Sequence, residues 1–191
     1  HDELSKNPRT FDIDASVIIA GYFDLERDDN FSIPQRLLRP SWAIYHPYVI
    51  NRTYNLNIID KIIREPYVNI LDDLFDGEKE ALVIDNYLTT YTNQLFTPEY
   101  LNEYSTLSIF DPYKNAIKEN SLLDTKLSGD LLLIHSMEDE IVPYSQSENF
   151  YASVIATGTK AELVLLEKGK HNIQDYVGAV VDALDWLKNY E

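Results

Sequence analysis

Two apolar runs in the last third of the chain, each followed by a helical pattern, constrain the fold more than any other feature. Residues 130–135 and 161–166 are short, rich in leucine, isoleucine and valine, and typical of strands in a parallel sheet. A strand–helix–strand–helix order requires a right-handed crossover and makes the two strands parallel neighbours. The sequence therefore predicts an α/β fold.

The helices that follow these two runs carry apolar residues at helical spacing. The first helix is predicted from Pro143 to about Thr157, with Gly158 as its C-terminal cap, and the second lies near the end of the chain. Their expected buried faces are Phe150, Tyr151, Val154 and Ile155 in the first helix, and Val177, Val180, Val181, Leu184 and Leu187 in the second.

The rest of the chain divides into a strand and a helical insertion. Residues 15–21 form a largely apolar run ending at a glycine, which predicts a third strand buried on both faces. We expect residues 1–31 to hold the end of a helix, this strand and a loop, residues 32–123 to form an all-helical cap insertion, and residues 124–191 to form the βαβα unit.

Short proline-punctuated patterns define the helices expected in the insertion, with Thr97 and Asp111 as N-caps. The opening residues, from His1 to Pro8, are typical of the last turns of a helix, so we expect the chain to be a piece of a longer protein. The helices expected in the insertion are residues 34–38, 42–49, 58–63, 78–95, 98–104 and 112–119.

Composition excludes several classes of function. The chain has 32 Asp plus Glu against 16 Lys plus Arg, and a net charge of −16 repels phosphate backbones, so we expect no nucleic-acid partner. No apolar run approaches the roughly 20 residues that span a bilayer. Because the chain contains no cysteine, thiolate catalysis and cysteine-ligated metals are excluded.

Two polar residues follow the two predicted C-terminal strands, Asp139 after the first and His171 after the second. Loops at the carboxyl ends of neighbouring parallel strands lie at the same edge of a sheet. A carboxylate there can accept the ring N–H of a histidine, fix its tautomer and stabilise the imidazolium formed during acyl transfer. Asp139 and His171 are therefore the candidate catalytic residues.

Other residues compete for these roles. Glu138 and Glu140 flank the candidate acid, and we expect both to point to solvent. We predict that His135 is a core or turn histidine at the strand end and that His46 is a surface or packing residue. The acidic loop together with His135 is also a weak candidate metal site, although it lacks EF-hand spacing.

The stretch from about residue 130 to the end resembles the C-terminal part of α/β-hydrolases. Residues 135–143 resemble the family's acid loop, His-Gly-x-x-Asp-x-x-Val-Pro, and residues 169–171 resemble the loop that carries the catalytic histidine. Ser136 replaces the usual glycine, a change expected to alter the turn without touching the chemistry. Four further segments resemble sequence motifs of bacterial secreted lipase- or esterase-like hydrolases that have a helical cap. They are residues 21–25, 65–67, 74–77 and 95–98.

The resemblance implies a serine hydrolase without a cofactor, which acts on an ester or acyl substrate; peptide bonds are the second choice of substrate. No two of the six glycines are four residues apart, so the chain has no Gly-x-Ser-x-Gly nucleophile motif. We therefore expect the serine to lie upstream and the chain alone to be inactive. Its expected partners are the missing N-terminal half or a second copy, and its expected location is secreted or in the bacterial cell envelope.

A non-catalytic function is the alternative. The chain carries 14 tyrosines beside its strong negative charge, a composition that also suits an acidic interaction module with a degenerate hydrolase tail. A nucleophile motif upstream of His1 favours the enzyme, and its absence favours the module.

Overall fold

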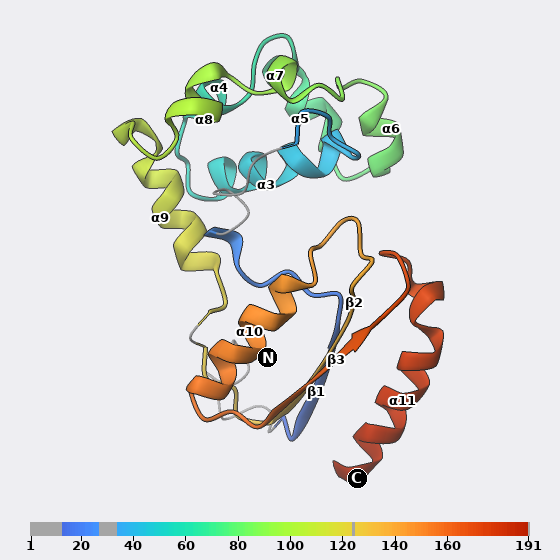
Figure 1. The fold of residues 1–191 in the computed structure, drawn as a ribbon. Coiled ribbons are helices and arrows are strands. Elements are labelled where there is room, and N and C mark those ends of the chain that lie inside the picture. Colours follow the sequence, from blue (N-terminus) through green and yellow to red (C-terminus); the bar gives the residue numbers. More distant parts are fainter. Residues whose placement is uncertain (1–12, 27–33, 124, 191) are drawn as a thin grey trace. The chain divides into compact units, whose positions relative to one another are not determined.

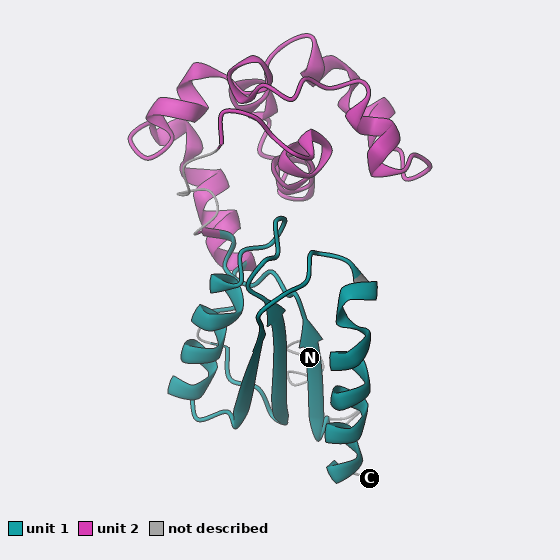
Figure 2. Ribbon diagram, turned by 45° about the vertical axis from the view of Figure 1, so that its right-hand side comes forward, with its two compact units in different colours: residues 1–25, 121–191 teal, residues 26–120 magenta. Residues whose placement is uncertain are grey.

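The computed structural model describes residues 13–26, 34–123 and 125–190 and divides the chain into two compact units (Figure 2). The first, called here the α/β unit, comprises His1–Leu25 and Ser121–Glu191. The second, called here the helical unit, comprises Glu26–Asn120. The helix end predicted before Pro8 lies outside the described residues.

The α/β unit contains a parallel sheet with the strand order β1-β2-β3 (Figure 1). Leu133 of the central strand lies opposite Ile18 on one side and Leu163 on the other. The predicted α/β class with parallel strands and flanking helices is confirmed. Its elements are β1 (Ala15–Ile19), β2 (Asp130–Ser136), α10 (Ser145–Ala156), β3 (Ala161–Leu166), η3 (Ile173–Tyr176), α11 (Val177–Leu187) and η4 (Lys188–Tyr190).

Each face of the sheet has its own apolar core, because alternate residues of a strand point to opposite faces. Leu131 and Leu133 of β2 pack with α10, whereas Leu132 and Ile134 pack with α11. All four are at least 96% buried, and burying each side chain contributes about 1.5–3 kcal/mol. β2 is therefore the best-anchored element of the unit, and it leads directly into the candidate acid loop.

The buried face predicted for the last helix is only partly right: Val180 packs against the sheet core, but three of the other predicted residues do not. Val177, Val181 and Leu184 of α11 are more than half exposed, with exposed fractions of 59%, 54% and 57%. The helix packs on the sheet through Ala179 and Ala183, whose small side chains allow a close approach. Because α11 is apolar on more than one side, its periodicity did not decide which side is buried.

Two smaller expectations about burial also fail. Ile155, expected on the buried side of α10, is 43% exposed. β1 is half-buried rather than buried on both faces, because it pairs only with β2 in the described part of the sheet.

The helical unit consists mostly of short helices (Figure 1). Its core is rich in aromatic side chains. Phe96, Tyr100, Phe110 and Tyr113 are buried, and ring contacts join Tyr100 to each of the other three. No helix within the described ranges is long and apolar enough to cross a membrane. The elements are α3 (Pro40–Thr53), α4 (Ile59–Ile62), η1 (Tyr67–Ile70), α5 (Leu71–Leu74), α6 (Ala81–Asp85), α7 (Thr92–Leu95), α8 (Pro98–Glu103), η2 (Ser108–Phe110) and α9 (Asp111–Asn120).

Two of the helices predicted here are wrong for one reason. Residues 34–38 are not helical, and the helix predicted over 78–95 is split into α6 and α7. Leu37 N–H donates to the Thr90 carbonyl at 2.8 Å, and Thr92 N–H donates to the Gln35 carbonyl at 3.2 Å. These bonds between distant segments satisfy the main chain and replace the local helical bonds.

The two capping predictions have different outcomes. Thr97 caps α8 as predicted, because its side chain accepts a hydrogen bond from Tyr100 N–H at 3.2 Å. Asp111 is instead the first residue inside α9, directly after η2.

Candidate active site

The two candidate catalytic residues lie on neighbouring loops at the carboxyl ends of β2 and β3 (Figure 1). Asp139 follows β2, and His171 follows β3. His171 Nδ1 is 2.8 Å from Asp139 Oδ2, a hydrogen-bonding distance. The structure thus brings together the two side chains that the topology predicted to be neighbours.

Asp139 is held rigidly in this position. Its side chain is fully buried, and Oδ1 accepts hydrogen bonds from the main-chain N–H groups of Ile141 and Val142, both at 2.9 Å. Oδ2 is thereby directed at His171. Burial alone would raise the pKa of Asp139, but hydrogen bonds from His171, Val142 and Ile141 outweigh it and hold the pKa below its ordinary value. The carboxylate is therefore ionised at neutral pH.

His171 is accessible where Asp139 is not. Its side chain is 28% exposed, so a substrate or a nucleophile can reach the ring. With Nδ1–H donating to the carboxylate, Nε2 carries the lone pair and lies on the side of the ring away from Asp139. This arrangement can accept a proton at Nε2 and stabilise the resulting imidazolium.

A sequence model of the prolyl oligopeptidase family matches residues 72–190, which is more than half of the chain and includes both loops. The chain belongs to the prolyl oligopeptidase family. No curated protein shows a significant similarity to it.

Solved structures similar to this prolyl oligopeptidase family chain include an esterase, a lipase and a putative hydrolase. The G231F mutant of the rice cell wall degrading esterase LipA from Xanthomonas oryzae aligns over 98% of this chain and 54% of its own, with a TM-score of 0.76 and 19% identity. A putative hydrolase from Legionella pneumophila aligns over 100% and 52%, with a TM-score of 0.73 and 20% identity. Candida antarctica lipase A aligns over 98% and 44%, with a TM-score of 0.66 and 13% identity.

These comparisons show that the chain has the α/β-hydrolase fold. It spans about half the length of the solved structures that it matches, so it corresponds to one part of their fold. The predicted resemblance to the C-terminal half of α/β-hydrolases is confirmed.

The second histidine near the acid has a different environment in this family member. His135 is completely buried, with Nδ1 2.7 Å from Ser147 Oγ and Nε2 2.9 Å from the Val142 carbonyl. A carbonyl only accepts hydrogen bonds, so Nε2 carries a proton, and Nδ1 is paired with the serine hydroxyl. Although Nε2 is also 3.3 Å from Asp139 Oδ2, both ring nitrogens are occupied and the ring is inaccessible. His135 is thus a core residue, as predicted.

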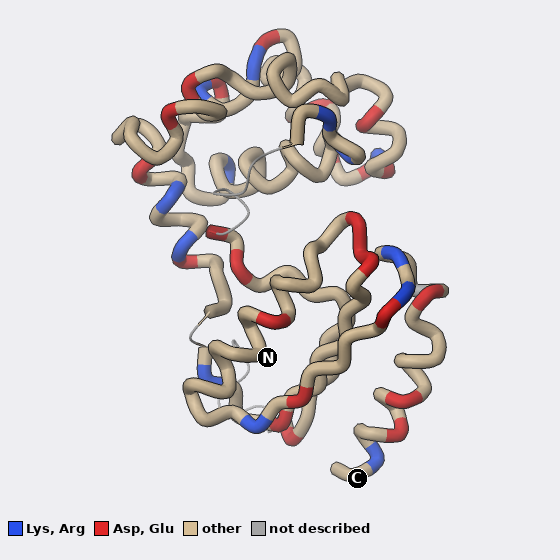
Figure 3. Tube along the Cα trace, in the orientation of Figure 1, with Lys and Arg blue, Asp and Glu red and all other residues tan. Residues whose placement is uncertain are grey.

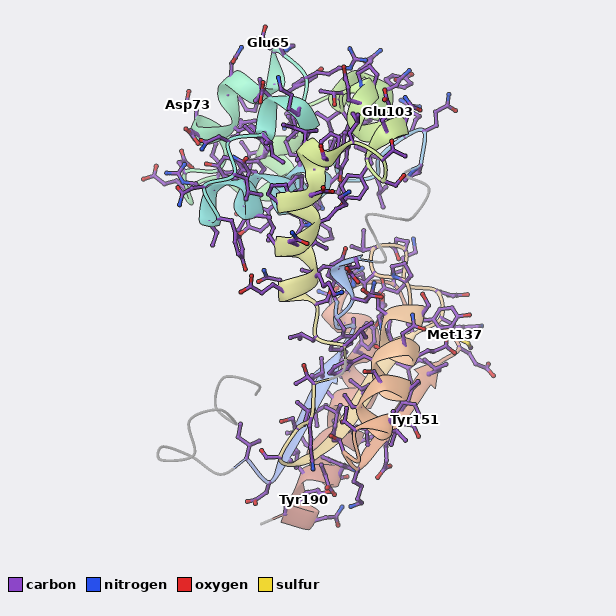
Figure 4. The ribbon with its side chains drawn as sticks, turned by 90° about the vertical axis from the view of Figure 1, so that its left-hand side faces the viewer. Glu65, Asp73, Glu103, Met137, Tyr151 and Tyr190 are labelled. Atoms are coloured by element: carbon purple, nitrogen blue, oxygen red, sulfur yellow. The ribbon has the colours of Figure 1, made fainter. Side chains whose placement is uncertain are left out.

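The competing acidic residues, Glu138 and Glu140, are exposed to solvent, as predicted. In Figure 3, the acidic stretch after β2 and the basic stretch after β3 lie on neighbouring loops. Glu140 Oε1 lies 3.9 Å from Lys170 Nζ. Met137, on the same loop, is 42% exposed at the surface of the unit (Figure 4). Among residues 13–26, 34–123 and 125–190, no group of three or more His, Asp or Glu side chains is arranged to hold a metal ion.

His46 lies apart, in the helical unit. It is half-buried, its ring lies edge-on to Tyr113, and burial lowers its pKa. Among the described residues its Nε2 has no hydrogen-bond partner. This environment is that of a packing residue.

Sequence reasoning missed two buried polar residues near the site: Tyr176 contacts the acid, and Gln146 anchors the helix that follows the acid loop. Tyr176 is 2% exposed, and its hydroxyl donates to Asp139 Oδ2 at 3.4 Å. Gln146, at the start of α10, accepts from Phe23 N–H and Asp24 N–H at 3.0 and 2.8 Å and so ties α10 to the segment after β1. Both residues lie in apolar or helical patterns that show no polar role; the only signal for Tyr176 is its position shortly after His171.

Proposed function

We propose that this chain supplies the acid and the histidine of a Ser-His-Asp triad in a carboxylesterase- or lipase-like serine hydrolase. The observation that carries the proposal is the 2.8 Å contact between a buried, ionised Asp139 and an accessible His171. The family and the hydrolase fold support the same class of reaction.

In the proposed mechanism, a serine hydroxyl attacks the substrate carbonyl and His171 Nε2 takes the hydroxyl proton. Asp139 keeps Nδ1 protonated and stabilises the imidazolium. His171 then gives the proton to the leaving alcohol, and the same residues activate a water molecule to release the acyl group. Positioned general acid–base catalysis of this kind contributes about 10²- to 10⁴-fold.

The nucleophile is proposed to lie outside this chain. The chain contains no Gly-x-Ser-x-Gly motif, and the matched hydrolases are about twice its length. We therefore expect the 191-residue chain alone to leave esters intact.

The helical unit is proposed to act as the lid that selects the acyl or alcohol part of the substrate. It contains a pocket of about 350 Å³ whose lining includes Trp42, Tyr45 and Phe75. Aromatic walls of this kind suit an apolar group.

The missing half of the protein, or a second copy, is the proposed partner of the α/β unit. The exposed apolar residues Val177, Val181 and Leu184 on α11 and the unpaired edge of β1 in the described sheet support this. LipA is a rice cell wall degrading esterase, and by analogy we propose that this protein is secreted or held in the cell envelope.

Peptide bonds are the second candidate substrate, because the matching family is that of prolyl oligopeptidase. The test expresses the chain together with its native upstream sequence and measures hydrolysis of p-nitrophenyl butyrate and of a prolyl p-nitroanilide. We expect turnover of the ester and little of the anilide; the reverse ratio would establish a peptidase. An upstream sequence without a serine motif, and no turnover of either substrate, would support the non-catalytic module.

A further inference from the structure

Ser136, the last residue of β2, binds the histidine loop at both of its ends. The residue is completely buried. Its Oγ–H donates to the Gly169 carbonyl at 2.5 Å, and its main-chain N–H donates to the Tyr176 hydroxyl at 3.2 Å. Gly169 and Tyr176 stand before and after His171, so the segment that carries the histidine is fixed on both sides by one residue.

The same residue also binds the acid loop. Glu138 N–H donates to Ser136 Oγ, and Asp139 N–H donates to the Ser136 carbonyl, both at 3.2 Å. The Tyr176 hydroxyl that accepts from Ser136 N–H is itself 3.4 Å from Asp139 Oδ2. Residue 136 is therefore the point at which the loops of Asp139 and His171 are joined by hydrogen bonds.

The backbone around Gly169 is shaped for this contact. Gly169 has a φ of +126°, which a residue with a side chain rarely adopts. A Cβ there would lie 3.2 Å from Asp175 Cβ and 3.5 Å from Ser136 Oγ, so the loop approaches Ser136 closely. A second bond, from Lys170 N–H to Asp175 Oδ2 at 2.9 Å, closes the same loop.

Two of the four hydrogen bonds that Ser136 makes to the two loops need its hydroxyl group. Glycine or alanine there would leave the Gly169 carbonyl without its donor and Glu138 N–H without its acceptor, both next to the candidate pair. The sequence predicted that this serine leaves the chemistry unchanged, but the hydrogen bonds of Ser136 Oγ to both loops suggest a role that the sequence did not reveal.

We propose that Ser136 is a positioning residue that holds the His171 ring against Asp139 through Gly169 and Tyr176. Its effect on turnover rests on the proposed function, but its effect on the His171–Asp139 hydrogen bond does not. The two can therefore be measured separately.

The test follows the His171 Nδ1–H proton by NMR in the full 191-residue chain, with the signal assigned by its loss in His171→Asn. Ser136→Ala and Ser136→Gly are compared with Thr159→Val, which removes another buried hydroxyl that accepts a main-chain N–H, that of Leu127. We expect the proton to exchange with solvent about tenfold faster in the two Ser136 variants, the ratio for loss of one ordinary hydrogen bond, and at the wild-type rate in Thr159→Val.

An unchanged exchange rate in folded Ser136→Ala would overturn the proposal. If neither Ser136 variant folds, Tyr176→Phe decides, because it removes only the hydroxyl between Ser136 and Asp139: faster exchange supports the proposal and unchanged exchange overturns it. In the chain extended upstream, Ser136→Ala should lower kcat with little change in KM. Absence of ester turnover in that wild-type protein would defeat the proposed function, while the exchange result would still decide the role of Ser136.

Discussion

Different interactions determine where residues lie in the α/β unit and in the helical unit. In the α/β unit, strand order alone puts the ends of β2 and β3 side by side, and polar side chains then join the two loops. In the helical unit, several helices are only four to six residues long, and bonds between distant segments decide where they begin and end. The candidate pair, Asp139 and His171, thus lies in the unit whose geometry has fewer alternatives.

The largest expected difference between the two units is the effect on kcat of replacing His171, in the α/β unit, or His46, in the helical unit. In the protein extended upstream to include the proposed serine, His171→Ala should lower kcat by about 10⁴- to 10⁶-fold, because the proposed proton acceptor is lost. His46→Ala, in the helical unit, should change kcat by less than about threefold. Ester hydrolysis by both purified variants is the measurement. Comparable losses in the two would show that catalysis is not confined to the α/β unit.

The next comparison is between a buried residue of the sheet and an exposed apolar residue of α11. Leu133→Ala should lower the free energy of unfolding by about 2–5 kcal/mol, because Leu133 is completely buried in β2. Leu184→Ala, on the exposed side of α11, should cost less than about 0.5 kcal/mol. Urea unfolding followed by circular dichroism measures both. A large cost for Leu184→Ala would show that a second copy covers this face in the purified chain.

Sequence predicted the α/β unit well because few arrangements satisfy its pattern. Two apolar runs separated by a helix must be parallel neighbours, which is enough to place Asp139 beside His171. The pattern did not reveal Tyr176, because a buried tyrosine in an apolar helix start has the same signature whether or not its hydroxyl has a partner.

Sequence predicted the helical unit less well. Thr97 and Pro98 form a local signal, and α8 begins where they indicate. Residues 35–37 and 90–92 are set by bonds between segments more than fifty positions apart, which local propensity does not describe. The burial of α11 was only partly predicted for a related reason: the sheet, rather than the periodicity of the helix, selected the side with Ala179 and Ala183.

Removing the Thr97 cap in the helical unit should have a smaller effect on the free energy of unfolding. Thr97→Ala should cost about 1 kcal/mol, because the cap of α8 loses the oxygen that accepts Tyr100 N–H. Thr53→Ala, at the exposed end of α3, is the matched control and should be nearly neutral. Chemical unfolding of both variants tests this. Equal costs would mean that the Thr97 cap contributes nothing specific.

The smallest expected effect is on the pH dependence of stability. Because the pKa of Asp139 is below its ordinary value, its ionised form stabilises the fold above the unfolded-state pKa of about 3.9. That contribution disappears as the pH falls through the lower folded-state pKa. The Tm difference between wild type and Asp139→Asn should therefore narrow from pH 6 toward pH 2, in thermal melts at each pH. A difference that widens on acidification would reverse the assigned direction.

The central claim is that Asp139, and neither acidic neighbour, orients His171 for proton transfer. The most direct measurement is kcat for ester hydrolysis by the upstream-extended protein carrying Asp139→Asn, with Glu138→Gln and Glu140→Gln as matched controls. We predict a fall of about 10⁴-fold in kcat for Asp139→Asn and wild-type turnover for the controls. An Asp139→Asn variant with wild-type turnover, or an equal loss in either control, would contradict the account.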